Sequence, residues 1–171
     1  MGTLAMTMLL YKRIGANQYD SIYIIVGKTI VDDKDFEIFN KYRWFLHSNG
    51  YVYRKIKHKI IWLHREILIC PKDKVIDHIN HNKLDNRKSN LRVVTKSENQ
   101  HNRIKQTSRC SSRYKGVYYH KRDKCWIAQI TNNNTFIYIG SYNLEKEAAK
   151  AYNEKAKELF GKYALLNKLR G

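Results

Sequence analysis

Three things are scarce or missing in this sequence. No apolar run is long enough to cross a bilayer, and the mildly apolar start lacks a basic segment before it, which argues against a signal peptide. The three cysteines (Cys70, Cys110 and Cys125) form no Cys-x-x-Cys pair, so we expect no structural zinc, and an odd number of thiols favours a reducing compartment. Acidic residues number only 15 against 33 Lys and Arg, a net charge of +18. That balance predicts a polyanionic partner.

DNA, RNA and an anionic membrane would all satisfy this charge. No basic amphipathic helix stands out, which disfavours the membrane surface. The chain has 171 residues, enough for one medium domain or two small ones, and its 43% hydrophobic content is not that of a disordered chain. Its 13 tyrosines suit strands and nucleic-acid surfaces that mix rings with cations.

A β-β-α finger is predicted in the middle of the chain. Two short apolar runs, Val75–Ile79 and Leu91–Thr95, have the length and β-branched content of strands and flank a polar loop. Thr95 and Glu98 have the spacing of a capping box. A helix is therefore expected from Lys96 to about Gln106, directly after the second strand.

The residue types on this finger suit phosphodiester hydrolysis. A hard cation such as Mg²⁺ prefers oxygen ligands and takes only one or two from protein. Asp77 offers a carboxylate, and Asn99 offers an amide oxygen from the helix, with Asn102 as a second candidate one turn later. His78 follows Asp77 on the strand, so the two side chains point to opposite faces. A neutral imidazole there can accept a proton from water near neutral pH.

The combination VIDHIN, LDNRKSNLRVVT and NQHNR at positions 75–80, 84–95 and 99–103 resembles the phage-type HNH homing endonucleases with a ββα-metal (His-Me) finger. The resemblance implies that His78 is the general base and that Asp77 and Asn99 bind the metal. It also implies that Asn90 braces the loop and orients the histidine. Mg²⁺ is the expected metal, with Mn²⁺ as the alternative. Asn82, Asp85 and Asn86 are interpreted as loop structure, with Asp85 able to accept backbone N–H bonds.

The first third of the chain is predicted to be rich in strands. Asn49-Gly50 between two aromatic runs is typical of a hairpin. The acidic start near Asp33, followed by Phe36 and Phe39, indicates a short helix. This region resembles the segment that precedes the finger in phage-type HNH proteins. Its basic hairpin lies along DNA in one interpretation and is a plain sheet with solvated lysines in the other.

The last third is predicted to be three antiparallel strands and one helix. The strands are expected at 114–119, 125–131 and 135–141, and the helix runs from Leu144 to Phe160 with Asn143 as its cap and Gly161 as its end. The region resembles the AP2 DNA-binding domain in the motifs YKGV at 114–117, WIA at 126–128, YIGSY at 138–142, EAAKAY at 147–152 and ALLN at 164–167. Most of the arginines of plant AP2 factors are absent, so guanine readout is not expected from them.

The fold class expected is therefore α+β, with a strand-rich N-terminal segment, a ββα-metal finger and an AP2-like sheet packed on one helix. The predicted boundaries are residues 1–63 for the first segment, 64–106 for the finger, 107–113 for a basic linker and 114–171 for the AP2-like domain. The candidate DNA contacts are Arg54, Lys57, Arg65, Arg87, Arg92, Arg103, Lys105, Arg109, Arg113, Lys115, Tyr118, His120, Lys121, Arg122 and Tyr138. Thr131 and Phe136 also match the AP2 sheet face, and Trp126 is interpreted as core more than as contact.

The predicted function is a metal-dependent, site-specific DNA endonuclease of the homing type. It acts on double-stranded DNA in the cytoplasm and is phage-encoded in a bacterial host. One finger gives one active site, so a monomer would nick one strand and a homodimer could cut both. The alternatives are a non-enzymatic DNA-binding regulator that uses the AP2-like sheet, and an RNA-directed nuclease or RNA binder.

Overall fold

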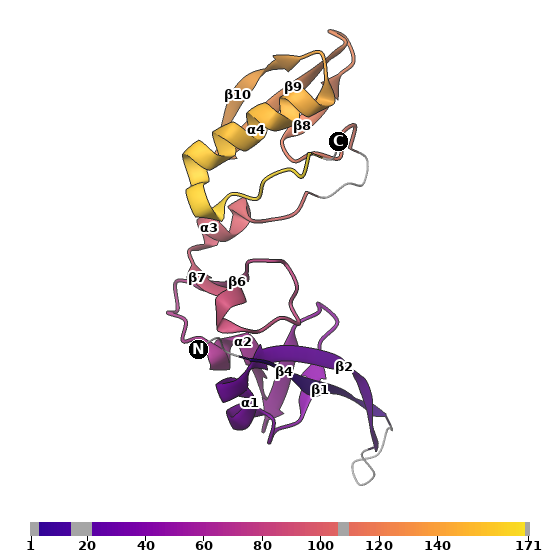
Figure 1. The fold of residues 1–171 in the computed structure, drawn as a ribbon, viewed down its shortest axis with the longest axis vertical. Helices are drawn as coiled ribbons and strands as arrows, with labels where there is room; N and C mark the ends of the chain where they lie inside the picture. Colours follow the sequence, from indigo (N-terminus) through magenta and orange to yellow (C-terminus); the bar gives the residue numbers. More distant parts are fainter. Residues whose placement is uncertain (1–3, 15–21, 106–109, 170–171) are drawn as a thin grey trace. The chain divides into compact units, whose positions relative to one another are not determined.

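A computed structural model describes residues 4–14, 22–105 and 110–169 of the chain. The chain divides into two compact units, Met1–Thr95 and Lys96–Gly171. Both mix helix and strand, and Figure 1 shows them in sequence colours. No helix in the described ranges combines the length and apolar character that crossing a membrane requires.

A five-stranded sheet forms the base of the first unit. Its strand order is β2-β1-β3-β4-β5, with bounds Ala5–Ile14 (β1), Ile22–Asp32 (β2), Trp44–Leu46 (β3), Val52–Ile56 (β4) and Lys59–Trp62 (β5). The strands pair antiparallel except β1 with β3. Two short helices, α1 (Asp33–Phe39) and α2 (Leu63–Ile67), follow β2 and β5 directly.

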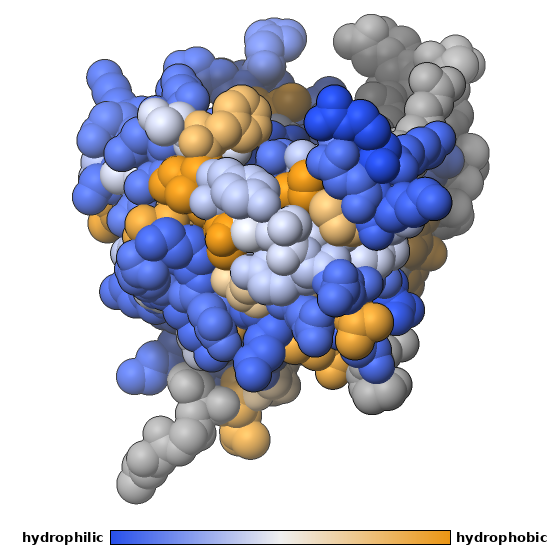
Figure 2. Space-filling model, turned by 90° about the horizontal axis from the view of Figure 1, so that it is seen from above, coloured by the Kyte–Doolittle hydropathy of each residue, from blue (hydrophilic) through white to orange (hydrophobic). Residues whose placement is uncertain are grey.

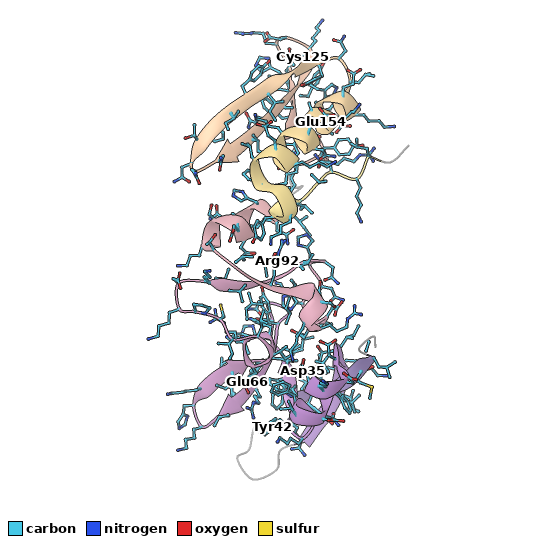
Figure 3. The ribbon with its side chains drawn as sticks, turned by 60° about the vertical axis from the view of Figure 1, so that its left-hand side comes forward. Asp35, Tyr42, Glu66, Arg92, Cys125 and Glu154 are labelled. Atoms are coloured by element: carbon cyan, nitrogen blue, oxygen red, sulfur yellow. The ribbon has the colours of Figure 1, made fainter. Side chains whose placement is uncertain are left out.

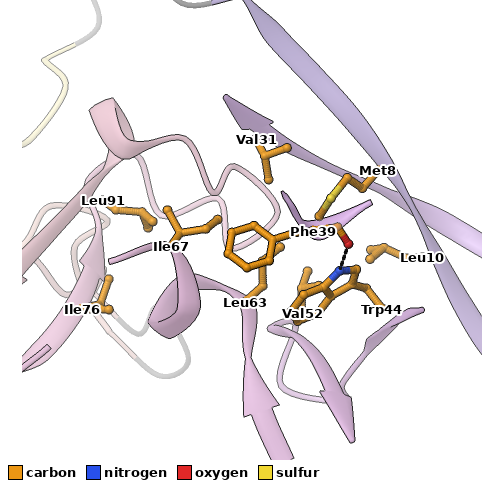
Figure 4. Close-up of a cluster of buried hydrophobic side chains, with 10 residues drawn as sticks. All are labelled: Met8, Leu10, Val31, Phe39, Trp44, Val52, Leu63, Ile67, Ile76 and Leu91. Atoms are coloured by element: carbon orange, nitrogen blue, oxygen red, sulfur yellow. Dashed lines mark hydrogen bonds between the residues drawn. The ribbon is translucent and has the colours of Figure 1, made fainter. Parts of the chain in front are cut away.

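The core of this unit lies where the helices meet the sheet (Figure 4). Trp44 and Leu63 are fully buried there, and the Trp44 indole N–H donates to the Phe39 carbonyl at 2.9 Å. Ile76 and Leu91 from the finger belong to the same cluster. The finger hairpin is therefore anchored by the hydrophobic core of the first unit.

The predicted finger hairpin is present as β6 (Val75–His78) and β7 (Leu91–Val94), paired antiparallel. A loop and a single 3₁₀ turn (η1, Lys88–Asn90) join them. The loop is fastened to β2, because the Ile30 amide donates to the Leu84 carbonyl and the Asn86 amide donates to the Ile30 carbonyl, both at 2.8 Å. The Lys88 amide also donates to the Asp32 carboxylate at 2.8 Å.

The second unit begins with α3 (Lys96–His101) and continues into the AP2-like sheet. Strands β8 (Val117–His120), β9 (Cys125–Asn132) and β10 (Thr135–Tyr142) are antiparallel in the order β10-β9-β8. Helix α4 (Glu145–Phe160) packs on one face of the sheet through Ala148, Ala149, Tyr152 and Ala156, and a 3₁₀ turn, η2 (Gly161–Tyr163), follows (Figure 1).

Several sequence-based details need correction. Within the strand-rich first third, β2 runs without a turn through Gly27, where its register against β1 shifts between Leu10 and Tyr11. Helix α3 ends at His101 and does not reach Gln106, which is itself outside the described residues. Helix α4 is capped by Leu144 without a side-chain hydrogen bond, so Asn143 is not the cap.

Candidate active site on the finger hairpin

Asp77 and His78 lie side by side on β6, and both are buried. Their side chains have different partners, as alternation along a strand requires. Asp77 Oδ2 accepts from Arg92 Nε at 2.9 Å and lies 2.7 Å from Arg92 Nη2, across the β6–β7 ladder (Figure 3 labels Arg92). His78 instead faces the loop and the first sheet.

Asn86 holds the His78 ring in one tautomer. The side-chain nitrogen of Asn86, Nδ2, donates to Thr29 Oγ1 at 2.9 Å and to the Lys83 carbonyl at 3.2 Å. A carbonyl only accepts, so this pair fixes the amide orientation and directs Oδ1 at His78 Nε2, 3.2 Å away. Nε2 therefore carries the hydrogen, and His78 Nδ1 keeps the lone pair that a general base needs.

Burial lowers the pKa of His78, outweighing the raising effects of the Asn86 hydrogen bond and of nearby carboxylates. Burial removes the water that would stabilise the protonated, charged imidazole, so the neutral form is favoured. His78 is accordingly neutral near pH 7, the protonation state in which it accepts a proton.

Aromatic rings enclose the other side of His78. The His64 ring centroid lies 5.5 Å away in an edge-on arrangement, and the Tyr51 centroid lies 5.8 Å away. His64 is 7% exposed, its Nδ1 has no hydrogen-bond partner, and burial, with the His78 and Arg65 charges, lowers its pKa to about 4. Burial first, and then Asp77, raises the pKa of Tyr51. These rings limit how the His78 side chain can turn.

Asn90 bridges the two ends of the loop. Its Oδ1 accepts from the Asn80 amide at 3.0 Å, and its Nδ2 donates to the Asp85 carbonyl at 2.7 Å. The Asn90 carbonyl also accepts from the Ile79 amide at 2.9 Å, directly after His78. These bonds are of the kind expected of a residue that braces the loop.

Asp85 stabilises the same loop. Its carboxylate accepts from Arg87 Nε at 2.8 Å and Nη2 at 2.7 Å, and from Asn80 Nδ2 at 3.0 Å. The Arg87 hydrogen bonds hold the pKa of Asp85 below its usual range. Sequence reasoning treated Asn86 and Asp85 alike as loop residues, yet only Asn86 touches the histidine. Its full burial depends on Thr29, 57 positions away, and no local pattern indicates that contact.

The other candidate metal ligand, Asn99, is half-buried on α3 in the second unit. Among the described residues no group of three or more His, Cys, Asp or Glu side chains could hold a metal. A site with one carboxylate and one amide oxygen still fits Mg²⁺, which keeps several waters and binds few protein ligands. The pairing of Asp77 with Asn99 stays a prediction.

Several predicted DNA contacts have partners inside their own unit, among them Arg87 and Arg92, which pair with Asp85 and Asp77 as described above. The Arg54 guanidinium pairs with Glu66 at 2.6 Å and lies 3.8 Å from the Tyr42 ring centroid (Figure 3 labels Glu66 and Tyr42). Lys105 Nζ donates to the Tyr114 and Val117 carbonyls at 2.7 and 2.9 Å. Lys115, discussed below, is bound in the same way.

Other candidates are exposed. Predicted contacts at the surface are Lys57, Arg65, Arg103, Arg113, Lys121 and Arg122, and Arg109 lies outside the described residues. Tyr118, His120, Thr131, Phe136 and Tyr138 alternate with the inward residues and so share the sheet face opposite α4. Phe136 and Tyr138 are 74% and 63% exposed. Figure 2, which views one face, shows hydrophilic residues around small hydrophobic groups.

Comparison with known proteins assigns the family. A sequence model of the HNH endonuclease family matches residues 55–101, and one of the AP2 domain matches residues 112–162. A protein of Acanthamoeba polyphaga mimivirus, named an uncharacterized HNH endonuclease, is 36% identical over 138 residues, 77% of this chain and 70% of the relative. The chain belongs to the HNH endonuclease family. An ethylene-responsive transcription factor of Arabidopsis thaliana is 40% identical over 62 residues, 35% of this chain and 14% of that factor.

Proposed function

We propose that this HNH endonuclease is a metal-dependent DNA endonuclease whose reaction centre is the β6–β7 hairpin. The observation that carries the proposal is the His78–Asn86 contact at 3.2 Å, in which an oriented amide oxygen leaves Nδ1 of a buried, neutral histidine as proton acceptor. Asp77, the neighbouring carboxylate, faces the opposite side of the strand.

In the proposed reaction His78 Nδ1 takes a proton from a water molecule as that water attacks phosphorus. The resulting imidazolium carries its two hydrogens on Nδ1 and Nε2, and Nε2–H remains bound to Asn86 Oδ1. The bond to the 3′ oxygen breaks and that oxygen takes a proton from a solvent water, which leaves 5′-phosphate and 3′-hydroxyl ends, and the imidazolium then returns its proton to the solvent. Asn90 and the Tyr51 and His64 rings hold the histidine in place for the proton transfer.

Asp77 and Asn99 are the residues that would hold the metal, with Mg²⁺ the expected ion and Mn²⁺ the alternative. A divalent ion bound there stabilises negative charge on the phosphate and on the leaving oxygen. Arg92 pairs with the Asp77 carboxylate through its Nε and Nη2. In the proposed complex its guanidinium adds a positive charge beside the phosphate.

The DNA-binding surface that we propose is the outer face of the AP2-like sheet, with the basic residues near it. The net charge of the whole chain, +18, suits binding to the phosphate backbone of a duplex. The exposed aromatic side chains of this face, Phe136 and Tyr138, offer apolar contact. Site-specific cutting, one nick per active site, and a homing role in a phage or other mobile element extend this proposal. The viral origin of the similar mimivirus protein supports the last of these.

The test is cleavage of a supercoiled plasmid that carries the native genomic neighbourhood of the gene, with Mg²⁺ or with EDTA. We expect open circles with Mg²⁺, none with EDTA, and strongly slowed nicking in Asp77→Asn. The matched control is Asp73→Asn, which removes an exposed carboxylate of the same unit. Linear product would point to paired active sites, as in a homodimer.

A second candidate is a DNA-binding regulator that does not cut. The match of the AP2-like unit to a plant transcription factor favours it. A wild-type protein that binds the plasmid tightly yet leaves it intact with both Mg²⁺ and Mn²⁺ would establish the regulator and exclude the nuclease.

A further inference from the structure

Helix α3 is built into the AP2-like unit. The HNH family match ends at residue 101 and the AP2 match begins at 112, but the compact units divide between Thr95 and Lys96. The boundary between units therefore falls inside the HNH segment. The candidate metal ligand Asn99 stands on this helix, whose last residue, His101, contacts the AP2-like unit.

The last turn of α3 is capped by a lysine from that unit. Lys115 Nζ donates to the carbonyl of His101 at 2.6 Å and to that of Arg103 at 2.9 Å. The last carbonyls of a helix have no partner within it and carry partial negative charge, so a cation placed there stabilises the helix. Burial lowers the pKa of Lys115 to about 8, which shows how far this ammonium has left the solvent.

Two further contacts hold the same turn. The His101 ring stacks on the Phe160 ring at the end of α4, with centroids 3.6 Å apart and planes 11° apart. The Leu165 amide donates to the His101 carbonyl at 3.4 Å. The helix is thus held by α4 and by the segment that follows it.

Lys115 is itself held rigidly. Its amide donates to Asn167 Oδ1 at 2.7 Å, and its carbonyl accepts from Asn167 Nδ2 at 3.0 Å. Asn167 in turn exchanges two hydrogen bonds with Asn153 of α4, at 2.7 and 2.9 Å. A continuous chain of hydrogen bonds therefore runs from α4 to the end of α3.

These contacts are needed because α3 has only six residues. An isolated helix shorter than about 12 residues is marginal in water. We propose that Lys115 and His101 are positioning residues that fix α3, and with it the metal-ligand amide of Asn99. The AP2-like unit then has a second role besides DNA binding, which is to position the Asn99 side chain. This inference rests on the proposed function of Asn99.

The experiment uses the full chain and three variants. Lys115→Met removes the donors and keeps the aliphatic stem, while His101→Ala removes the ring stack and favours helix by propensity. Lys150→Met removes one exposed positive charge from the same unit and is the matched control. Mn²⁺ affinity is measured by electron paramagnetic resonance, DNA affinity in EDTA, and single-turnover plasmid nicking with Mn²⁺.

We expect Lys115→Met and His101→Ala each to lower Mn²⁺ affinity and the nicking rate by about 10- to 100-fold, the usual effect of losing a residue that orients a ligand. DNA affinity should not change in His101→Ala, and Lys150→Met should match wild type. His101→Ala leaves Lys115 and Asn167 in place, so it tests the proposal even where Lys115→Met folds poorly.

Wild-type Mn²⁺ affinity and nicking in both variants would overturn the inference and leave the proposed nuclease intact. A parallel loss of DNA affinity in His101→Ala would also overturn it, because it would show damage to the DNA-binding unit as a whole. A wild-type chain that neither binds Mn²⁺ nor cuts would instead refute the proposed function.

Discussion

Protonation of His64 should destabilise the first unit. The ring is 7% exposed and packs between Tyr51 and His78, and burial with neighbouring positive charge lowers its pKa to about 4. The unfolded chain has a histidine pKa of about 6.5. The unfolded state thus binds more protons between these values, so this part of the stability is complete above about pH 6.5 and is lost as pH falls toward 4.

The magnitude follows from the two pKa values. At about pH 5 most unfolded chains carry the His64 proton and few folded chains do, which costs about 2 kcal/mol relative to about pH 7. Replacing the histidine with phenylalanine keeps a ring against Tyr51 and removes the proton. Between these two pH values His64→Phe should therefore lose about 2 kcal/mol less stability than wild type.

Urea unfolding of the full chain at both pH values measures this difference. Trp126→Phe in the wild-type background and in every variant leaves the fluorescence of Trp44 and Trp62, which report on the first unit. His58→Phe, at an exposed position of the same unit, is the control and should keep the wild-type pH dependence. Equal pH dependence in His64→Phe and wild type would refute the reasoning.

Three other predictions concern both units. Asn86→Ala should slow single-turnover nicking by about 10- to 100-fold while DNA affinity in EDTA is kept, because it removes the oxygen that orients the general base. Gly116→Ala should destabilise the second unit by more than about 3 kcal/mol in thermal melts, since φ is +73° and a Cβ would overlap the Tyr152 ring; Gly161→Ala, with φ +50° and open space around it, should cost far less. Phe136→Ala should weaken DNA binding about 10-fold in gel-shift assays without changing the melting temperature, because the ring is 74% exposed.

The elements that local sequence signals define were predicted well. Strands of the finger and of the AP2-like sheet carry β-branched runs with turn residues between them, and the structure confirms β6, β7 and β8 to β10. Gly161 ends α4 as expected, with φ +50°. The hairpin around Asn49-Gly50 is also present, with φ +85° at Gly50.

What the sequence did not predict depends on distant residues. Strand β1 exists through its pairing with β2 and β3, and its own sequence gives no clear period. Helix α3 ends at His101, where Lys115, 14 positions later, donates to the His101 carbonyl. Leu144 was expected as the first residue of the C-terminal helix, but it is the N-cap residue of α4 and is 59% exposed.

The same contrast between local signals and contacts with distant residues applies to the candidate site. Asp77, His78 and Asn90 could be predicted because motif and spacing are local, and the structure places their side chains in one hairpin. The roles of Asn86 and His64 could not be predicted, because both depend on the tertiary fold. Asn86 is oriented toward His78 by its hydrogen bond to Thr29 of β2, and His64 reaches His78 from α2. Arg54 was predicted as a DNA contact because it lies in a basic hairpin, but the structure pairs its guanidinium with the Glu66 carboxylate.

The most direct test of the central claim is chemical rescue of the general base. His78→Gly should not nick supercoiled plasmid with Mg²⁺, and added imidazole should restore nicking in a dose-dependent way, because free imidazole can occupy the vacated space and accept the proton. Nicking by His78→Gly at the wild-type rate without imidazole would contradict the assignment of His78 as the base.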